Sequence, residues 1–117
     1  MSSGSKHEIV IAGRGGQGIL LAGYILGKAL VDEGYYVVNS EEYSAETRGG
    51  DSKAELIVAK DEEPDLMTVQ RADIAAFMYT DQMSKYYKLV GKSATLVLDS
   101  TFIKEAPKDA GKGFMAT

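Results

Sequence analysis

A glycine-rich turn between a short buried strand and a long apolar helix constrains the fold of this chain more than any other feature. The turn fits the pattern G-x-G-x-x-G over residues 13–18. It follows the β-branched run 9–12, which is typical of a strand buried on both faces. It precedes the apolar stretch 17–33, which Gly34 closes as glycine closes many helices. Residues 35–39 then read as a second strand, so the chain opens with a strand, a helix and a strand.

The turn predicts a contact with an anion. Glycine permits positive φ and close backbone approach, and the free amide groups at the start of a helix favour a pyrophosphate or a carboxylate. The candidate binding residues are Gly13, Arg14, Gly15, Gly16, Gln17 and Gly18. A purely structural role, in which the glycines only let the helix pack on the sheet, accounts for the same residues.

The later segments alternate between strand and helix patterns. Together they predict an open, mostly parallel α/β sheet, Rossmann-like and three-layered, with helices on both of its faces. The expected elements are strands at 53–59, 74–79 and 94–98 and helices at 66–71 and 80–90. The charged residues of 53–59 favour an edge position for that strand. Thr80 or Asp81 is expected to cap the last helix, and Gly91 to end it.

The chain is expected to contain one domain. Its 117 residues suffice for a single core, and we place the α/β domain at residues 7–103. The small polar residues 1–6 are interpreted as a leader or a tag remnant without regular structure. The tail, 104–117, has no clear period and is expected to be loosely ordered.

Composition excludes several function classes. The chain has no cysteine and one histidine, so it cannot form a disulfide, a thiolate metal site, an iron–sulfur cluster or a thiol nucleophile. A net charge of -4 argues against a nucleic-acid partner. The longest apolar stretch, 19–27, is too short to span a bilayer, and no secretory signal opens the chain, so a cytoplasmic location without membrane contact is expected.

The polar connection 40–51 is too long for a plain turn and suggests a second functional segment. Glu41 and Glu42 lie where a dinucleotide-binding domain places its ribose carboxylate, although a solvated pair on a loop is the interpretation we favour. Arg48 is a bidentate donor to anions, and the two glycines after it let backbone approach a ligand or a partner. A surface pair between Glu46 and Arg48 is the structural alternative.

The two glycine-containing motifs together resemble the gamma subunit, or gamma domain, of 2-oxoacid:ferredoxin oxidoreductases. The resemblance runs from about Glu8 to Ser100 and rests on two segments, Ile9-Val10-Ile11-Ala12-Gly13-Arg14-Gly15-Gly16-Gln17-Gly18 and Tyr43-Ser44-Ala45-Glu46-Thr47-Arg48-Gly49-Gly50. Members usually continue with further helix and strand, so the chain looks like a C-terminally short version of the domain. A sheet edge left uncovered in this way predicts self-association of the isolated chain.

The resemblance implies a share in the oxidative decarboxylation of a 2-oxoacid with coenzyme A, which gives acyl-CoA and carbon dioxide while ferredoxin takes the electrons. It implies alpha, beta and ferredoxin-like delta partner subunits, which carry thiamine diphosphate, magnesium and iron–sulfur clusters. The gamma part is then a packing and binding subunit that is inactive alone, with the glycine turn and Arg48 helping to shape the coenzyme A environment. The stretch 48–55 favours 2-oxoglutarate over the other 2-oxoacids.

Two other functions remain open from the sequence. One is a self-sufficient NAD- or FAD-binding domain of a dehydrogenase, which would use Glu41 or Glu42 on the ribose. The other is a non-catalytic assembly module whose glycine turn binds no ligand. The sequence shows no histidine, cysteine or lysine paired with a catalytic partner, which disfavours activity in isolation.

Overall fold

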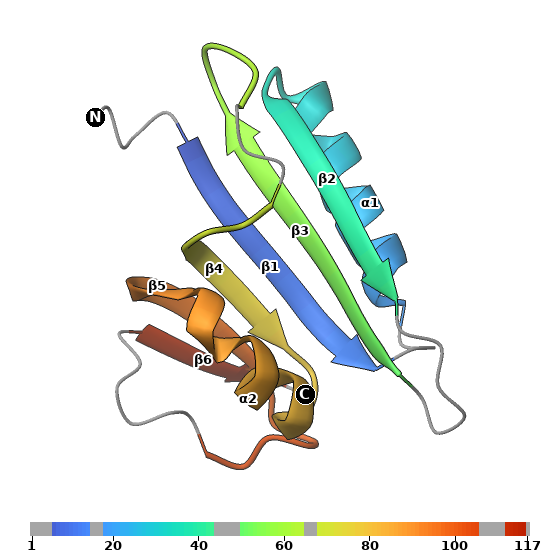
Figure 1. Cartoon of the computed structure of the whole chain (residues 1–117), viewed down its shortest axis with the longest axis vertical. Helices are drawn as coiled ribbons and strands as arrows, with labels where there is room; N and C mark the ends of the chain where they lie inside the picture. Colours follow the sequence, from blue (N-terminus) through green and yellow to red (C-terminus); the bar gives the residue numbers. More distant parts are fainter. Residues whose placement is uncertain (1–5, 15–17, 44–49, 65–67, 106–111, 117) are drawn as a thin grey trace.

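The computed structural model describes residues 6–14, 18–43, 50–64, 68–105 and 112–116 (Figure 1). Within these residues the elements follow the chain in this order: β1 (Lys6–Arg14), α1 (Ile19–Asp32), β2 (Tyr36–Tyr43), β3 (Asp51–Ala59), β4 (Ala72–Phe77), α2 (Thr80–Tyr86), the 3-10 helix η2 (Tyr87–Leu89), β5 (Val90–Asp99) and β6 (Lys112–Ala116). No helix in this part of the chain is long and apolar enough to cross a membrane.

The sheet is mixed. Six strands of the described residues lie in the order β2-β3-β1-β4-β5-β6. The neighbours β1 and β4, β4 and β5, and β5 and β6 are parallel, whereas β3 runs antiparallel to both β1 and β2. The α/β class is therefore confirmed, and the prediction of a mostly parallel, Rossmann-like sheet is corrected for the β2-β3-β1 part.

The interior position of β3 corrects a second prediction. This strand was expected at an edge because it carries Lys53 and Glu55, but it lies between β1 and β2 and its residues 52–59 are all buried. The two charges are tolerated because Lys53 Nζ lies 2.7 Å from Glu55 Oε2. In this strand the two charged residues therefore indicate an ion pair inside the sheet and not an edge position.

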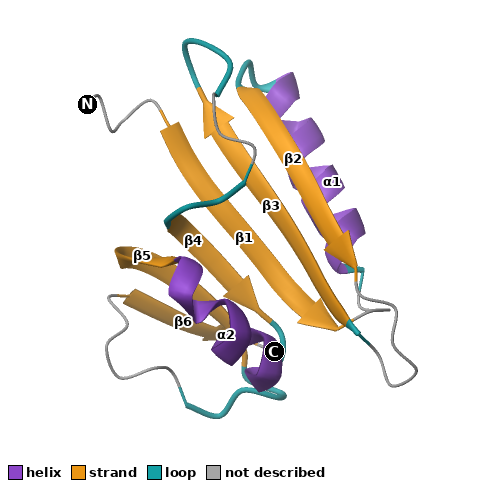
Figure 2. Cartoon of the chain, viewed as in Figure 1, coloured by secondary structure: helices purple, strands orange, loops and turns teal. Residues whose placement is uncertain are grey.

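The two helices α1 and α2 cover opposite faces of the sheet, as Figure 2 shows, with α1 behind β2 and β3 and α2 in front. Successive side chains of β3 point to opposite faces of the sheet. Ala54 and Leu56 pack against α1 on one face, whereas Lys53 lies over the ring of Tyr86 in α2 on the other face. The core on the α2 face includes Val10, Ile57, Phe77, Met83, Leu96 and Leu98. The smaller core on the α1 face is built on Ile9, Leu56 and Val58. The predicted three-layer arrangement is thus present over these elements.

Helix α1 forms as predicted but is less buried than its composition suggests. It is apolar around most of its circumference, yet only one side packs on β2 and β3. Its outer side leaves large apolar side chains 53 to 60% exposed: Leu21, Tyr24, Ile25 and Val31. Exposed apolar surface of this kind is typical of proteins that bind other chains.

Three further expectations about secondary structure differ from the structure. The helix expected to reach Val90 ends at Tyr86 and continues as η2, and Gly91 lies inside β5. The helix expected at 66–71 is not found over 68–71, the part of it that the structure describes. The tail expected to be loosely ordered contains β6, which pairs with β5 from Thr95 to Asp99. Five residues with one glycine show no clear alternation, so only the pairing with β5 reveals this strand.

Candidate functional site

The two segments that the sequence analysis singled out lie close together at one end of the strands, an edge of the sheet formed by the ends of β1 and β2 and the start of β3. The carboxyl ends of β1 and β2 lie beside the start of β3 at this edge (Figure 1). In the strand register Gly13 and Tyr43 both pair with Ser52, and Arg14 pairs with Asp51. The glycine turn and the ends of the connection that carries Arg48 therefore meet on either side of the same strand.

The start of α1 has no side-chain cap from its N-cap residue, Gly18. Gly18 precedes the helix with φ of 74°, a left-handed conformation that favours glycine. Glycine has no side chain to cap the helix, and the first turn carries the apolar residues Ile19, Leu20 and Leu21. Free amide groups at a helix start carry partial positive charge, so this end of α1 can bind an anion.

A hollow of about 240 Å³ lies at this helix start. Its lining comes from α1, from the end of β2 and from the start of β3: Gly18, Ile19, Leu20, Leu21, Tyr43 and Ser52. The hollow is apolar on the helix side, and its polar lining residues, Tyr43 and Ser52, come from the two strands. Such a hollow suits a ligand that has one anionic group and an apolar or aromatic part.

Arg14, a candidate from the glycine turn, lies toward α2. Its Nη2 is 3.3 Å from Asp81 Oδ2, and its guanidinium carbon lies 4.4 Å from the centre of the Tyr79 ring. Tyr79 in turn stacks on Phe102 with 4.2 Å between ring centres. These contacts direct Arg14 to the α2 face of the sheet edge, whereas the hollow at α1 opens on the other face.

The helix cap predicted at Thr80 or Asp81 is wrong. Tyr79 occupies the N-cap position of α2 and makes no side-chain capping bond. The Thr80 hydroxyl instead donates to the Phe102 carbonyl at 3.4 Å, and Asp81 contacts Arg14. Both polar residues are used in contacts distant in sequence, which a local capping argument does not detect.

A charged network on the α2 face holds the start of β3. Asp51 accepts a hydrogen bond from Gln82 Nε2 at 2.7 Å and also pairs with the ammonium group of Lys85. A hollow of about 420 Å³ adjoins this pair, lined by Glu42, Tyr43, Asp51, Lys85 and Tyr86. Asp51 is thereby tied to α2 next to the connection that carries Arg48.

The same network extends to Lys53, which is buried. Lys53 Nζ lies 2.7 Å from Glu55 Oε2 and 3.4 Å from Glu42 Oε1. Burial opposes the charged form of Lys53, but the contacts with Glu55 and Glu42 outweigh it and raise the pKa of Lys53. Burial of the Tyr86 hydroxyl raises the pKa of Tyr86.

Asp51→Asn is expected to reduce the loss of stability in acid. The hydrogen bond from Lys85, and next that from Gln82, lowers the pKa of Asp51. An acid with a lowered folded pKa stabilises the fold above its unfolded pKa, and this contribution is lost as pH falls through the folded pKa. Urea midpoints at about pH 7 and about pH 3 should therefore differ less for Asp51→Asn than for wild type. Asp61→Asn, in an exposed turn, is the control, and equal differences in all three proteins would contradict the expectation.

The structure describes only some of the predicted site residues. Gly13, Arg14 and Gly18 lie where β1 ends and α1 begins, whereas Gly15, Gly16, Gln17 and Arg48 lie outside the described residues. Gln82 and Lys53 belong to the charged network beside these residues and were not predicted. The signal for Lys53 was the pattern Lys-x-Glu inside an apolar strand, and no local pattern pointed to Gln82.

The ribose role of Glu41 and Glu42 is disfavoured by the strand order. A dinucleotide fold places its second strand beside the first, so that the carboxylate reaches the ligand on the glycine turn. Here β3 lies between β1 and β2, which separates the two by twice the usual strand spacing of about 4.8 Å. Glu42 instead contacts Lys53. The dehydrogenase alternative therefore loses its main support.

Comparison with known proteins identifies the family. A family model described as "Pyruvate ferredoxin/flavodoxin oxidoreductase" matches residues 8–116. The chain belongs to this family. The resemblance to oxidoreductases of this kind that the two motifs suggested is thereby confirmed.

Curated relatives in this family are archaeal subunits. The chain is 41% identical over 101 residues to "2-oxoglutarate synthase subunit KorC" of Methanothermobacter marburgensis, a match that covers 86% of this chain and 54% of the relative. It is 38% identical to the protein of the same name from Archaeoglobus fulgidus, covering 82% of this chain and 51% of the relative. The chain thus spans about half the length of the curated relatives it matches.

Solved structures in the family share the fold. The crystal structure of the keto/oxoacid ferredoxin oxidoreductase gamma subunit from Geobacter sulfurreducens has a TM-score of 0.75 and 30% identity, and the match covers 94% of this chain and 58% of that one. The 2-oxoglutarate:ferredoxin oxidoreductase from Magnetococcus marinus, with 2-oxoglutarate, coenzyme A and succinyl-CoA bound, has a TM-score of 0.76 at 18% identity and covers 95% of this chain and 19% of that one. At that identity the likeness concerns the fold alone.

Proposed function

We propose that this chain acts as the gamma-type part of a 2-oxoacid:ferredoxin oxidoreductase complex, and that 2-oxoglutarate is the 2-oxoacid. The complex would oxidise and decarboxylate the 2-oxoacid, transfer the acyl group to coenzyme A and pass the electrons to ferredoxin. Membership of the family supports the reaction class, and the names of the relatives that match most of this chain support 2-oxoglutarate.

The role proposed for this chain is to bind an anionic part of coenzyme A at the start of α1. The observation that carries this role is the open helix start at Gly18, beside a hollow lined by Tyr43 and Ser52. Phosphate groups bind at such helix starts because the amide donors and the helix dipole both favour negative charge. Arg48 would add a charged donor from the connection between β2 and β3.

The remaining cofactors are proposed to lie on partner chains, the alpha, beta and ferredoxin-like delta subunits. Iron–sulfur clusters need thiolate ligands, and this chain has no cysteine. Thiamine diphosphate, when bound on its own chains with magnesium, supplies an electron sink for the carbon chemistry. Within the described residues no group of three or more histidine or carboxylate side chains is placed to hold a metal ion. The half-exposed apolar side of α1 fits a chain that acts only within such a complex.

Arg48→Ala is expected to raise the apparent KM for coenzyme A of the assembled enzyme about tenfold and to leave kcat within about twofold. The reason is that a charge-assisted hydrogen bond to a phosphate contributes to binding and takes no part in the carbon chemistry. Steady-state kinetics of the complex, with coenzyme A varied at saturating 2-oxoglutarate and ferredoxin, measure both constants.

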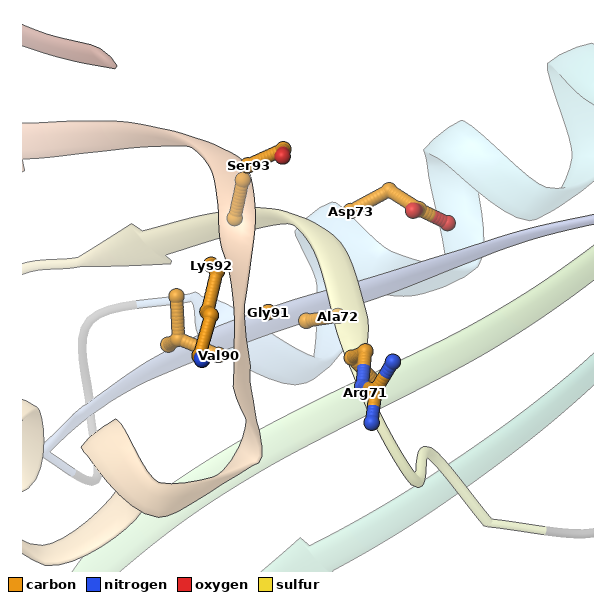
Figure 3. A pocket seen from close by; sticks show the side chains of 8 residues that line it. Arg71, Ala72, Asp73, Val90, Gly91, Lys92 and Ser93 are labelled. Carbon is orange, nitrogen blue, oxygen red and sulfur yellow. The ribbon is translucent and has the colours of Figure 1, made fainter. Parts of the chain in front are cut away.

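Arg71→Ala is the matched control. Arg71 is exposed at the opposite edge of the sheet, where it helps to line a hollow of about 480 Å³ at the starts of β4 and β5 (Figure 3). This variant removes the same side chain far from the proposed site and should keep the wild-type KM. An Arg48→Ala enzyme with unchanged KM would refute the proposed role of Arg48, and a chain that fails to assemble with thiamine-binding partners would refute the function.

A further inference from the structure

Gln82 is a buried amide that satisfies only part of its hydrogen-bonding capacity. The residue is 4% exposed, and its Nε2 donates to Asp51 Oδ1 at 2.7 Å. Its Oε1 is buried and has no hydrogen-bond partner among the described residues. A buried acceptor without a donor costs the desolvation of that group. This cost offsets much of the stability that the Nε2–Asp51 hydrogen bond contributes.

The contact of Gln82 with Asp51 controls the first residues of β3. Asp51 and Ser52 are adjacent, so their side chains point to opposite faces of the sheet. Asp51 is held on the α2 face by Gln82, and Ser52 lines the hollow at the start of α1 on the other face. A rotation of the strand that released Asp51 would also move Ser52.

Gln82 is better placed than Lys85 to set this geometry. Lys85 also contacts Asp51, but its side chain is 56% exposed and its ammonium group is therefore in contact with solvent. Gln82 is enclosed by packed neighbours, which restrict its rotamer, so its single hydrogen bond has a defined direction. Lys85 therefore neutralises the charge of Asp51, and Gln82 fixes the orientation of its carboxylate.

We propose that Gln82 is a positioning residue for the anion site at the start of α1. Through Asp51 it fixes the start of β3, and with it the Ser52 wall of the hollow. The inference rests on the proposed function, because it assumes that coenzyme A binds at this hollow. The positioning role would connect α2 on one face of the sheet with the proposed ligand site on the other face, through Asp51 and Ser52.

The test is Gln82→Met, which keeps the length of the side chain and removes both the donor to Asp51 and the unpaired acceptor. Coenzyme A is titrated into the isotopically labelled full chain, and the backbone amide shifts of Gly18, Ile19 and Ser52 report its dissociation constant. We expect binding about fivefold weaker than in wild type, with a melting temperature close to that of wild type, because the lost hydrogen bond and the removed unpaired acceptor offset each other. A purely structural role would instead lower the melting temperature.

The rescue variant combines Asp51→Asn with Gln82→Glu. The amide now lies on residue 51 and the carboxylate on residue 82, so the same hydrogen bond forms with its direction reversed. We expect the dissociation constant to return to within about twofold of wild type.

Three outcomes separate the two proposals. Unchanged affinity in Gln82→Met overturns the positioning role and leaves the anion site intact. Weaker binding that the rescue variant fails to restore also overturns it. A wild-type chain whose amides at Gly18 and Ile19 do not respond to coenzyme A overturns the proposed ligand site, and the positioning role with it.

Discussion

Gly23→Ala is expected to destabilise the chain by about 2 kcal/mol, in the range found for overpacked cores. A Cβ atom on Gly23 would lie 2.5 Å from the Cβ of Ala54 in β3. Neither atom can move away on a flexible side chain, because both are attached directly to backbone, and Ala54 is fully buried. Helix α1 would have to shift away from β3, which would weaken the core on that face. Urea unfolding of the two proteins measures the difference in the free energy of unfolding.

Gly27→Ala is the control, because it makes the same change in the same helix. Its Cβ would lie 3.3 Å from the Cδ2 of Leu56, the end of a side chain that has to shift by only a few tenths of an ångström. Helix propensity then dominates, since alanine is favoured over glycine by about 1 kcal/mol. Gly27→Ala should therefore be neutral or stabilising, and Ala54→Gly should restore most of the stability of Gly23→Ala. Similar effects of the two single changes would contradict the close approach at Gly23.

The sequence predicted the opening of the fold well because its signals are local. The turn at residues 13–18 and the helix after it follow from glycine and from an apolar period, and both can be read within a window of twenty residues. The strands at 35–39, 53–59, 74–79 and 94–98 were also found, with boundaries shifted by a few residues. Apolar runs between turns are enough to predict that such strands exist.

The order of the strands was not predictable in the same way. Whether β3 lies at an edge or between β1 and β2 depends on pairings distant in the chain, such as that of Val10 with Glu55. Charges in a strand favour an edge only when they have no partner. Lys53 and Glu55 are partners in an ion pair, so the edge rule does not apply to them. A rule based on single residues therefore predicted the wrong position for β3.

The sequence analysis singled out the glycine turn of the candidate site, but it did not single out the residues that hold the start of β3. Glycines at a strand-to-helix turn have a direct chemical interpretation, and Gly18 has the left-handed conformation that this interpretation requires. Gln82 lies 31 residues from Asp51 in the chain, and its importance follows only from burial and from a contact across the fold. Glutamine in a short polar helix carries no such information locally.

Lys53→Met is expected to destabilise the chain by about 3 kcal/mol, because it leaves the buried carboxylate of Glu55 without its cation. The side chains of Lys53 and Glu55 are 9% and 6% exposed, so water cannot replace the lost partner. Glu55 is also held in place, since its Oε1 accepts a hydrogen bond from the backbone amide of Val69 at 3.1 Å. Lys60→Met removes an exposed lysine just after the same strand and should change stability by less than about 0.5 kcal/mol.

The double variant Lys53→Met with Glu55→Gln tests the cause. Glutamine at position 55 keeps an acceptor for the Val69 amide and carries no charge, so the cost of an unpaired buried anion disappears. The double variant should recover at least about half of the stability lost in Lys53→Met, a coupling that a double-mutant cycle quantifies. If the two losses simply added, Lys53 would stabilise the chain by packing on Tyr86 rather than by neutralising Glu55.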